Sequence, residues 1–214
     1  DIVVATTSGV RAYDHNGNQM WDNRGLSGHI YGTCDNPAIA DMDADGKPEV
    51  VMGNAILDHN GRTLGTGNFG MGNVQGQNVG TTSFPVDIDG DGQLEVVVGN
   101  ALYRIDGSTI WSNQLGDGYV AVGNFDRDNA AEIVVSAMGQ VRIQDDNGRI
   151  ICSAAIPGSG STYYGGPPTV ADFDGDGEAE FALAAGSRYS VFEKDCSVKW
   201  QAVTQDASSG NTGS

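Results

Sequence analysis

Basic residues are scarce in this sequence. Only 11 lysines and arginines stand against 28 aspartates and glutamates, which gives a formal net charge of −17. Nucleic acids and anionic membrane surfaces both select basic protein surfaces, so the composition disfavours both as partners. No apolar run approaches the roughly 18–20 residues of a membrane-spanning helix, so membrane insertion is not expected either.

Cysteine is nearly absent as well, with only Cys34, Cys152 and Cys196 in the chain. An odd number of cysteines cannot pair completely within one chain, and the absence of a CxxC motif argues against zinc. One disulfide is consistent with a secreted protein, and Cys152 and Cys196 are a candidate pair for it. Three unpaired thiols are the alternative.

Helical periodicity is also missing. No stretch of about 10–15 residues repeats its apolar positions with a helical period. The sequence instead has 32 glycines, and its short β-branched runs are bounded by Gly, Asn and Asp. This pattern predicts an all-β protein, and 214 residues with 39% hydrophobic content are enough for one domain with a core.

Motifs of the common enzyme classes are lacking. There is no nucleophile elbow, no HExxH, and no glycine-rich phosphate loop between a strand and a helix. His15 and His59 occupy equivalent Asp-His-Asn-Gly segments and are interpreted as turn residues, while His29 lies in a loop without an evident partner. An enzyme is therefore the less favoured interpretation.

What the sequence does have is an acidic pattern that occurs four times. It reads D-x-D-x-D-G-x-x-E and is followed by an apolar run, and the copies begin at Asp41, Asp87, Asn124 and Asp172. The third copy departs from the pattern, because it starts with Asn124 and has Asn129 in place of Gly. Asparagine offers an amide oxygen and tolerates left-handed backbone, so a site is expected there too.

Each acidic copy is followed by a strand–turn–strand pattern, and one more such pattern, at 11–21, precedes the first copy. Four of these five turns contain Gly after Asn or Asp, which is a strong hairpin signal, and the turn at 194–197 departs from it. Trp21, Trp111 and Trp200 fall at the same place after a turn, so we expect them to pack between units. Four strands in roughly 40–45 residues are typical of a β-propeller blade.

The acidic spacing suits a hard cation with oxygen ligands. Positions 1, 3 and 5 supply side-chain oxygens, position 7 a backbone carbonyl, and position 9 a carboxylate, and calcium accepts about 6–8 such oxygens. The rival EF-hand loop has its Glu at position 12 between helices, whereas here the acid is at position 9 and a strand follows. Soft metals are disfavoured because no soft ligand is near. We expect about four calcium ions.

At these residues the chain resembles the FG-GAP/VCBS repeats of the integrin α-subunit β-propeller, in the bacterial VCBS-type form, over essentially its whole length. The resemblance implies a calcium loop between the first two strands of each four-stranded blade. It carries the metal-ligand role to Asp41, Asp43, Asp45, Lys47, Glu49, Asp87, Asp89, Asp91, Gln93, Glu95, Asn124, Asp126, Asp128, Ala130, Glu132, Asp172, Asp174, Asp176, Glu178 and Glu180. Lys47, Gln93, Ala130 and Glu178 would contribute backbone carbonyls.

The repeat also divides the chain. Asp1 aligns with Glu95, at position 9 of a loop, which predicts a partial blade at 1–36 and blades at 37–83, 84–118, 119–166 and 167–214. Because members of the family usually have about seven blades, we expect the chain to be part of a larger propeller or to be completed by other chains. A five-bladed ring is the alternative.

Three functions compete. The first is an extracellular, secreted or cell-surface adhesion module that binds protein or carbohydrate on the face opposite the calcium loops, at 23–36, 65–83, 113–119 and 153–168, where Tyr163 and Tyr164 lie. The second is a structural repeat unit of an extracellular assembly or filament. The third is a polysaccharide lyase-like enzyme, for which Arg24 and Arg188 are candidate residues.

Overall fold

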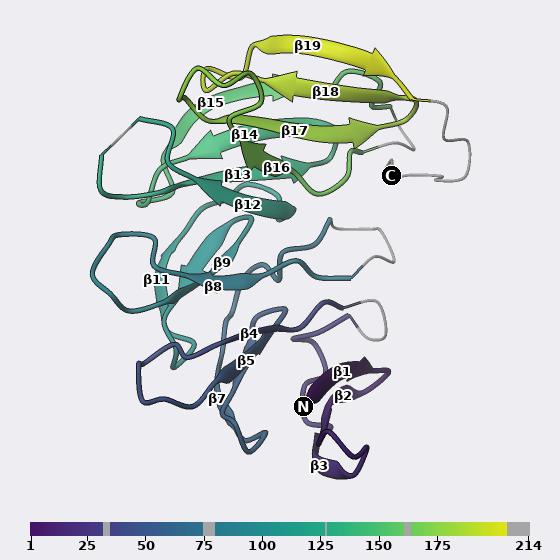
Figure 1. Ribbon diagram of the computed structural model, residues 1–214, viewed down its shortest axis with the longest axis vertical. Coiled ribbons are helices and arrows are strands. Elements are labelled where there is room, and N and C mark those ends of the chain that lie inside the picture. Colours follow the sequence, from purple (N-terminus) through teal and green to yellow (C-terminus); the bar gives the residue numbers. More distant parts are fainter. Residues whose placement is uncertain (32–34, 75–79, 127, 161–163, 205–214) are drawn as a thin grey trace. The chain divides into compact units, whose positions relative to one another are not determined.

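The computed structural model describes residues 1–31, 35–74, 80–126, 128–160 and 164–204 (Figure 1). Every helix or strand assigned in this part of the chain is a β-strand, and the strands form five antiparallel sheets. The predicted all-β class is therefore confirmed. Cys34, Tyr163 and the tail at 205–214 lie outside the described residues.

The chain divides into two compact units, and each is described by itself. Unit 1 comprises Asp1–Asp87 and Asp91–Asp117 and contains three sheets. In strand order these are β1 (Ile2–Thr6), β2 (Gly9–Tyr13) and β3 (Gln19–Asn23); β4 (Ala38–Ala40), β5 (Glu49–Met52), β6 (Ala55–Leu57) and β7 (Thr63–Thr66); and β8 (Phe84–Val86), β9 (Glu95–Val98), β10 (Ala101–Tyr103) and β11 (Thr109–Ser112).

Unit 2 comprises Ile88–Gly90 and Gly118–Ser214 and contains two sheets. They are formed by β12 (Tyr119–Gly123), β13 (Glu132–Ala137), β14 (Gln140–Gln144) and β15 (Ile150–Ala155), and by β16 (Thr169–Ala171), β17 (Glu180–Ala185), β18 (Arg188–Phe192) and β19 (Val198–Val203). In every sheet, strands that follow one another in sequence are also neighbours in space. This meander needs only short connections, which is why hairpin signals dominate the sequence.

The two middle strands of each four-stranded sheet form the core. All residues of β9 and β10 are buried, and so are those of β5 and β6. Runs such as Val96–Val98 can be apolar on both faces because protein covers both sides of these strands. The first strands of adjacent sheets lie side by side within each unit, β4 beside β8 and β12 beside β16 (Figure 1).

The hairpin turns share one geometry in all five sheets. In the first turn the Gly17 N–H donates to the Asp14 carbonyl, and glycines at the same turn position have φ near +80°, for example Gly61 at 78° and Gly107 at 76°. The turn at 194–197 forms the same hydrogen bond, from Cys196 N–H to Glu193, with Cys196 at φ 64°. The departure seen in the sequence therefore leaves the turn type unchanged.

Three of these turns, at Gly61, Gly107 and Cys196, pack tightly against the last strand of the preceding sheet in the same unit. In unit 1 a Cβ at Gly61 would lie 2.5 Å from the Trp21 ring, and one at Gly107 would meet the backbone of Thr66. In unit 2 the equivalent Cys196 forms a disulfide with Cys152 of β15, with 5.7 Å between Cα atoms. The position that elsewhere requires glycine thus carries the covalent link between the two sheets.

The expected tryptophan packing is seen for Trp21. Its Nε1–H donates to the His59 carbonyl at 3.0 Å, and its ring lies against Gly61 of the next sheet. Trp200 of β19 differs, because 43% of it is exposed and its aromatic neighbour, Tyr189, lies in its own sheet. The same sequence position is therefore covered in one sheet and open in another.

Candidate metal centres

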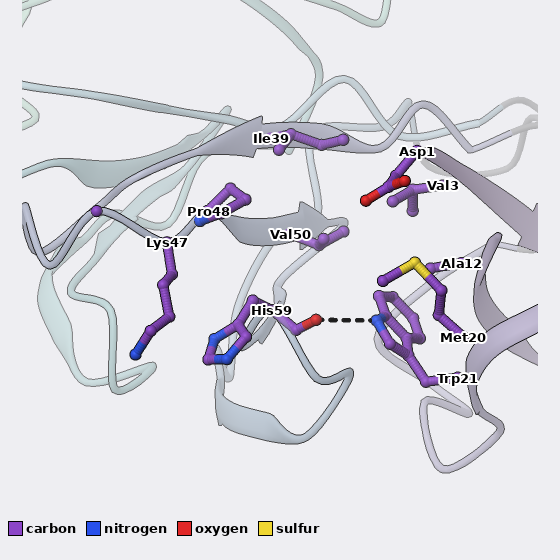
Figure 2. Close-up of a pocket in the computed structure, with 11 residues that line it drawn as sticks. Asp1, Val3, Ala12, Met20, Trp21, Ile39, Lys47, Pro48, Val50 and His59 are labelled. Carbon is purple, nitrogen blue, oxygen red and sulfur yellow. Dashed lines mark hydrogen bonds between the residues drawn. The ribbon is translucent and has the colours of Figure 1, made fainter. Parts of the chain in front are cut away.

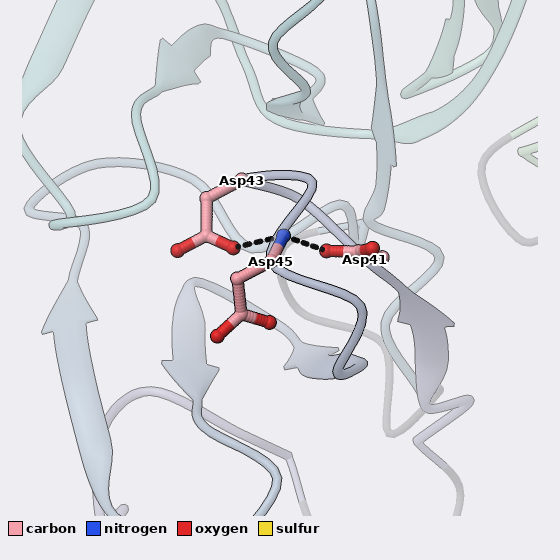
Figure 3. Close-up of side chains that lie close together, drawn as sticks. All are labelled: Asp41, Asp43 and Asp45. Carbon is pink, nitrogen blue, oxygen red and sulfur yellow. Dashed lines mark hydrogen bonds between the residues drawn. The ribbon is translucent and has the colours of Figure 1, made fainter.

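The four acidic loops connect the first and second strands of their sheets. In the first loop (Figure 3) the Asp45 N–H donates to Oδ1 of Asp41 at 3.0 Å and to Oδ1 of Asp43 at 3.2 Å. Gly46, whose φ is 83°, donates its N–H to Oδ2 of Asp41 at 2.9 Å. The backbone therefore curls around the first carboxylate and turns the following ones toward the same region.

Three acidic side chains converge in each loop, with ligand atoms within 4.8 Å of one another. The groups are Asp41, Asp43 and Asp45; Asp87, Asp89 and Glu95; Asp126, Asp128 and Glu132; and Asp172, Asp174 and Glu180. Each set consists only of carboxylates, a donor set that hard cations prefer. The members differ in their loop positions, which are 1, 3 and 5 in the first loop and 1, 3 and 9 in the second and fourth.

The residue at position 7 has a constant local role. Its N–H donates to Oδ1 of the position-5 aspartate at 2.8 Å in every loop, in the pairs Lys47 to Asp45, Gln93 to Asp91, Ala130 to Asp128 and Glu178 to Asp176. This bond fixes the peptide group whose neighbouring carbonyl the sequence predicts as a ligand. It also explains why Asp91 and Asp176 are oriented by the backbone although the converging groups of their loops do not include them.

The glutamate at position 9 is buried and ties the loop to the sheet. Glu49 is 4% exposed and accepts the Met42 N–H at 2.9 Å, while Glu132 accepts the Phe125 N–H at 2.6 Å. Burial raises the pKa of both glutamates, and the nearby loop aspartates raise it further. A bound divalent cation would favour the ionised carboxylates, so these residues fit such an ion electrostatically.

The third loop needs a local change before it can ligate as predicted. Asn124 points its amide nitrogen inward, where Nδ2 donates to the carbonyls of Asp128 at 2.6 Å and Ala130 at 3.3 Å. The second of these is the carbonyl that the sequence predicts as a ligand. Rotating the Asn124 side-chain amide by a half turn would exchange its nitrogen for its oxygen. The Asn124 side-chain oxygen and the Ala130 carbonyl oxygen would then both face a cation.

In the fourth loop, the ammonium group of a lysine contacts the acidic side chains. Nζ of Lys199 in β19 lies 2.7 Å from Asp174, 3.2 Å from Glu180 and 2.9 Å from Glu193. Hydrogen bonds to Asp174 and Glu193 raise the pKa of Lys199, and the lysine lowers the pKa of Asp174. The ammonium group thus touches two of the predicted metal ligands, which the sequence pattern did not reveal.

Two buried aspartates outside the acidic repeat, Asp35 and Asp117, accept hydrogen bonds from loops at the strand ends opposite the acidic loops. Asp117 accepts the N–H groups of Met71 at 2.7 Å and Gly99 at 2.9 Å. Asp35 accepts those of Tyr31 at 2.6 Å and Thr81 at 2.9 Å. Sequence reasoning missed both, although each stands two or three residues before the first strand of its sheet.

Other candidate residues have local partners. His29, for which the sequence indicated no partner, lies 2.8 Å through Nδ1 from the side-chain oxygen of Asn54. Arg24 contacts Asp22 at 2.8 Å and lines a cavity of about 210 Å³ with Ser27 and Tyr31. Arg188, in unit 2, lies 3.4 Å from Gln201.

Comparisons with known proteins support the fold. No family model and no curated protein sequence matches the chain. Among solved structures, the chain is similar to the Vibrio cholerae biofilm matrix protein Bap1, with a TM-score of 0.64 and 22% identity over 95% of this chain and 35% of that one. It is also similar to the dihydro-heme d1 dehydrogenase NirN, with a TM-score of 0.57 and 16% identity over 94% of this chain and 44% of that one.

A third similar structure is BBS1N in complex with ARL6DN, with a TM-score of 0.54 and 15% identity over 95% of this chain and 64% of that one. The chain thus spans between about a third and two thirds of these proteins. They are β-propeller-like, and at these identities they establish the fold class alone. The chain accordingly has a β-propeller-like fold. Within the described residues, no helix is long and apolar enough to cross a membrane.

Proposed function

We propose that this chain is a calcium-binding β-propeller module of the FG-GAP/VCBS type. The observation that carries the proposal is the repeated convergence of three carboxylates within 4.8 Å, in four loops of the same design. Isolated acidic groups in this number would repel one another, whereas a divalent cation would stabilise them. The expected ligands are oxygens on flexible loops, which suits calcium better than the strict octahedron of magnesium.

Calorimetric titration of the chelator-treated protein with calcium tests this directly. We expect about four ions to bind, with Kd values on the order of 10⁻⁴–10⁻³ M, as in other extracellular modules. Replacing Asp43 by Asn should remove one site. The matched control is Asp106→Asn, which makes the same charge change at an exposed position of a hairpin turn outside the loops. No calcium uptake, or equal loss in both variants, would contradict the proposal.

The proposed role is extracellular adhesion or binding of a protein or carbohydrate. The disulfide between Cys152 and Cys196 is typical of an oxidising compartment. The likeness to a biofilm matrix protein favours the same location. Binding would use the loops at 23–36, 65–83, 113–119 and 153–168, where Asp35 and Asp117 order the described backbone. Glycan and matrix-protein arrays probed in calcium test this role, and binding that survives changes in those loops would count against it.

A structural role in an extracellular assembly is the second candidate, and the same likeness to a matrix protein favours it. For this structural role, the chain would belong to a propeller of about seven blades or be completed by other chains, and a five-bladed ring is the alternative. Electron microscopy of the purified protein distinguishes filaments, larger rings and single particles. The lyase hypothesis is tested separately by incubation with uronate polysaccharides, where absorbance of an unsaturated product would support it.

A further inference from the structure

Consecutive acidic loops are joined by a backbone hydrogen bond that recurs along the repeat. In unit 1 the Leu94 N–H, at position 8 of the second loop, donates to the Met42 carbonyl, at position 2 of the first loop, at 3.4 Å. In unit 2 the Ala131 N–H, at position 8 of the third loop, donates to the Ile88 carbonyl, at position 2 of the second loop, at 2.8 Å. These two hydrogen bonds are the loop links. Because the same two positions form both, the loop links belong to the repeat.

The donor of each loop link belongs to the same peptide group as a predicted metal ligand. The peptide group between Gln93 and Leu94 contains the Gln93 carbonyl, the ligand expected at position 7, as well as the Leu94 N–H. A trans peptide group is planar, and its carbonyl and N–H point in opposite directions, so fixing one of them fixes the other. The first loop therefore orients a predicted ligand of the second.

The acceptor of the first loop link is held firmly as well. Met42 donates its own N–H to Oε2 of Glu49 at 2.9 Å, and Glu49 is the position-9 ligand predicted for the first loop. The Met42 side chain is 2% exposed and packs with Val96 of the following sheet. The residues on either side of Met42 are the predicted ligands at positions 1 and 3. One buried residue thus connects three predicted ligands of the first loop to a predicted ligand of the second.

The first loop differs from the others at the donor position. Pro48 occupies position 8, directly before β5 (Figure 2), and proline has no N–H. Proline is compatible with a place at the start of a strand. A loop of this design therefore forms without a donor at position 8, which makes proline a suitable probe of the loop links.

We propose that calcium binding at consecutive loops is positively coupled through the loop links. Once the Gln93 carbonyl is held by an ion, the Leu94 N–H is fixed, and with it the backbone at Met42 that carries the ligands of the first loop. Less conformational entropy is then lost when the first loop binds its own ion. The inference rests on the proposed calcium function and adds regulation to it, because coupled loops fill over a narrower range of calcium concentration than independent ones.

Charge acts against this coupling. An ion in one loop reduces the negative charge near the next loop and so weakens its attraction for a second ion. The carboxylates of Asp43 and Asp89 are exposed, and salt screens exposed charges over about 8 Å at physiological ionic strength and about 3 Å at 1 M. Coupling through the loop links should therefore persist in 1 M salt, whereas the opposing effect of charge should fade.

A calcium titration that reports each loop separately tests the coupling. The backbone amides of Gly46 and Gly92 serve as the reporters in NMR spectra, because each donates to the position-1 aspartate of its own loop. Asp89→Asn disables the second loop and should weaken calcium binding read at Gly46 about fivefold. Asp43→Asn should weaken binding read at Gly92 by the same factor, because coupling between two binding sites is reciprocal.

Leu94→Pro shows whether the first loop link carries the coupling. The substitution removes the donor N–H at the position where the first loop already has proline. In this background Asp89→Asn should leave calcium binding at Gly46 unchanged, in physiological salt and in 1 M salt. Leu94→Ala is the matched control, because it shortens the side chain and keeps the N–H, so the fivefold effect of Asp89→Asn should remain.

The second loop link gives an independent test with a smaller side chain. Asp126→Asn disables the third loop, and calcium binding is again read at Gly92. We expect Asp126→Asn to weaken this binding at least about fivefold, since the hydrogen bond of 2.8 Å is shorter than that of the first link. The effect should disappear with Ala131→Pro and remain with Ala131→Ser, which keeps the N–H.

The outcomes separate this inference from the calcium proposal. Equal effects of Asp89→Asn in the Leu94→Pro and Leu94→Ala proteins would overturn the inference, and so would the absence of any effect in the otherwise unchanged protein. In both cases, calcium-dependent shifts at Gly46 and Gly92 would leave the calcium proposal standing. If calcium shifted neither glycine amide, both proposals would be wrong.

Discussion

At the scale of single residues, the candidate metal loops are similar in sequence but differ in what their side chains already contact. The first loop has its aspartates turned inward by backbone N–H groups, the third has an inward amide nitrogen at Asn124, and the fourth holds the Lys199 ammonium. Calcium must displace or rotate these groups in the third and fourth loops. The four sites should therefore have unequal affinities.

Lys199→Met tests this inequality. Removing the ammonium group leaves Asp174 and Glu180 available to the ion, so calcium affinity at the fourth loop should rise about tenfold. Calorimetry is best done in a background where Asp43, Asp89 and Asp126 are changed to Asn, which isolates this loop.

Lys194→Met is the matched control for that experiment. Lys194 pairs with the Glu178 side chain at 2.7 Å, and only the backbone of Glu178 is a predicted ligand. Its loss should leave the affinity of the fourth loop nearly unchanged. Equal effects of the two substitutions would show that only the overall charge matters.

Ala44 is a second residue with a local consequence. It stands at position 4 of the first loop with φ 58°, where Gly90 and Gly175 of other loops have φ 76° and 81°. A left-handed alanine costs roughly 1–2 kcal/mol, partly offset by the greater entropy that glycine loses on folding.

Ala44→Gly should accordingly stabilise the protein by about 0.5–1 kcal/mol, measured by urea denaturation in calcium. The converse change, Gly46→Ala at φ 83°, should destabilise it although no atom lies within 4 Å of the added Cβ. A neutral result for both would show that the loop backbone relaxes.

At the scale of elements, the hairpin turns at Gly61, Gly107 and Cys196 pack on the last strand of the preceding sheet in the same unit. Trp21 meets Gly61 in one such contact, and in another Cys152 is bonded to Cys196. The disulfide joins β15 to the turn between β18 and β19, residues that are 44 positions apart. Both partners lie in unit 2, so its effect should be confined to the stability of that unit.

Removing the disulfide with Cys152→Ala and Cys196→Gly should destabilise unit 2. In the chain-entropy account, a loop of this length contributes about 3–4 kcal/mol, and the glycine recovers part of the left-handed backbone cost. Denaturation under non-reducing conditions, followed by hydrogen exchange in β14 and β18, measures the loss. Unchanged exchange in both strands would contradict this expectation.

At the scale of the whole molecule, charge dominates. The predicted side-chain ligands include 15 of the 28 acidic residues, so the net charge of −17 is concentrated in the loops. Four calcium ions would reduce it to about −9. Without the ions, three carboxylates within 4.8 Å repel one another in each loop.

Chelation should therefore lower the melting temperature strongly. At a calcium concentration of about 100 times Kd, each independent site adds about 2.7 kcal/mol, so melting in calcium and in excess EGTA should differ by about 10 °C or more. Magnesium at the same concentration and ionic strength is the control and should have a smaller effect. Superimposable curves in calcium and EGTA would contradict the proposal.

Local sequence patterns were enough to predict the all-β class, the four acidic loops and the hairpin turns. Each loop is nine consecutive residues and each turn about four, so their geometry follows from local hydrogen bonds such as that of Asp45 to Asp41. Even the irregular turn at 194–197 could be placed, because its neighbours in the repeat fixed its position. Local chemistry was sufficient for these elements.

Which distant groups meet depends on how the sheets fold and pack. The tertiary structure pairs Cys152 with Cys196, brings Lys199 to Asp174, and forms an apolar cavity of about 390 Å³ between β1–β3 and β4–β5 (Figure 2). These contacts join different strands and sheets, and a spacing pattern along the chain does not fix them: the sequence offered Cys152 and Cys196 only as one candidate pair. They depend on how strands pair and how sheets pack, which sets the partners available to every side chain.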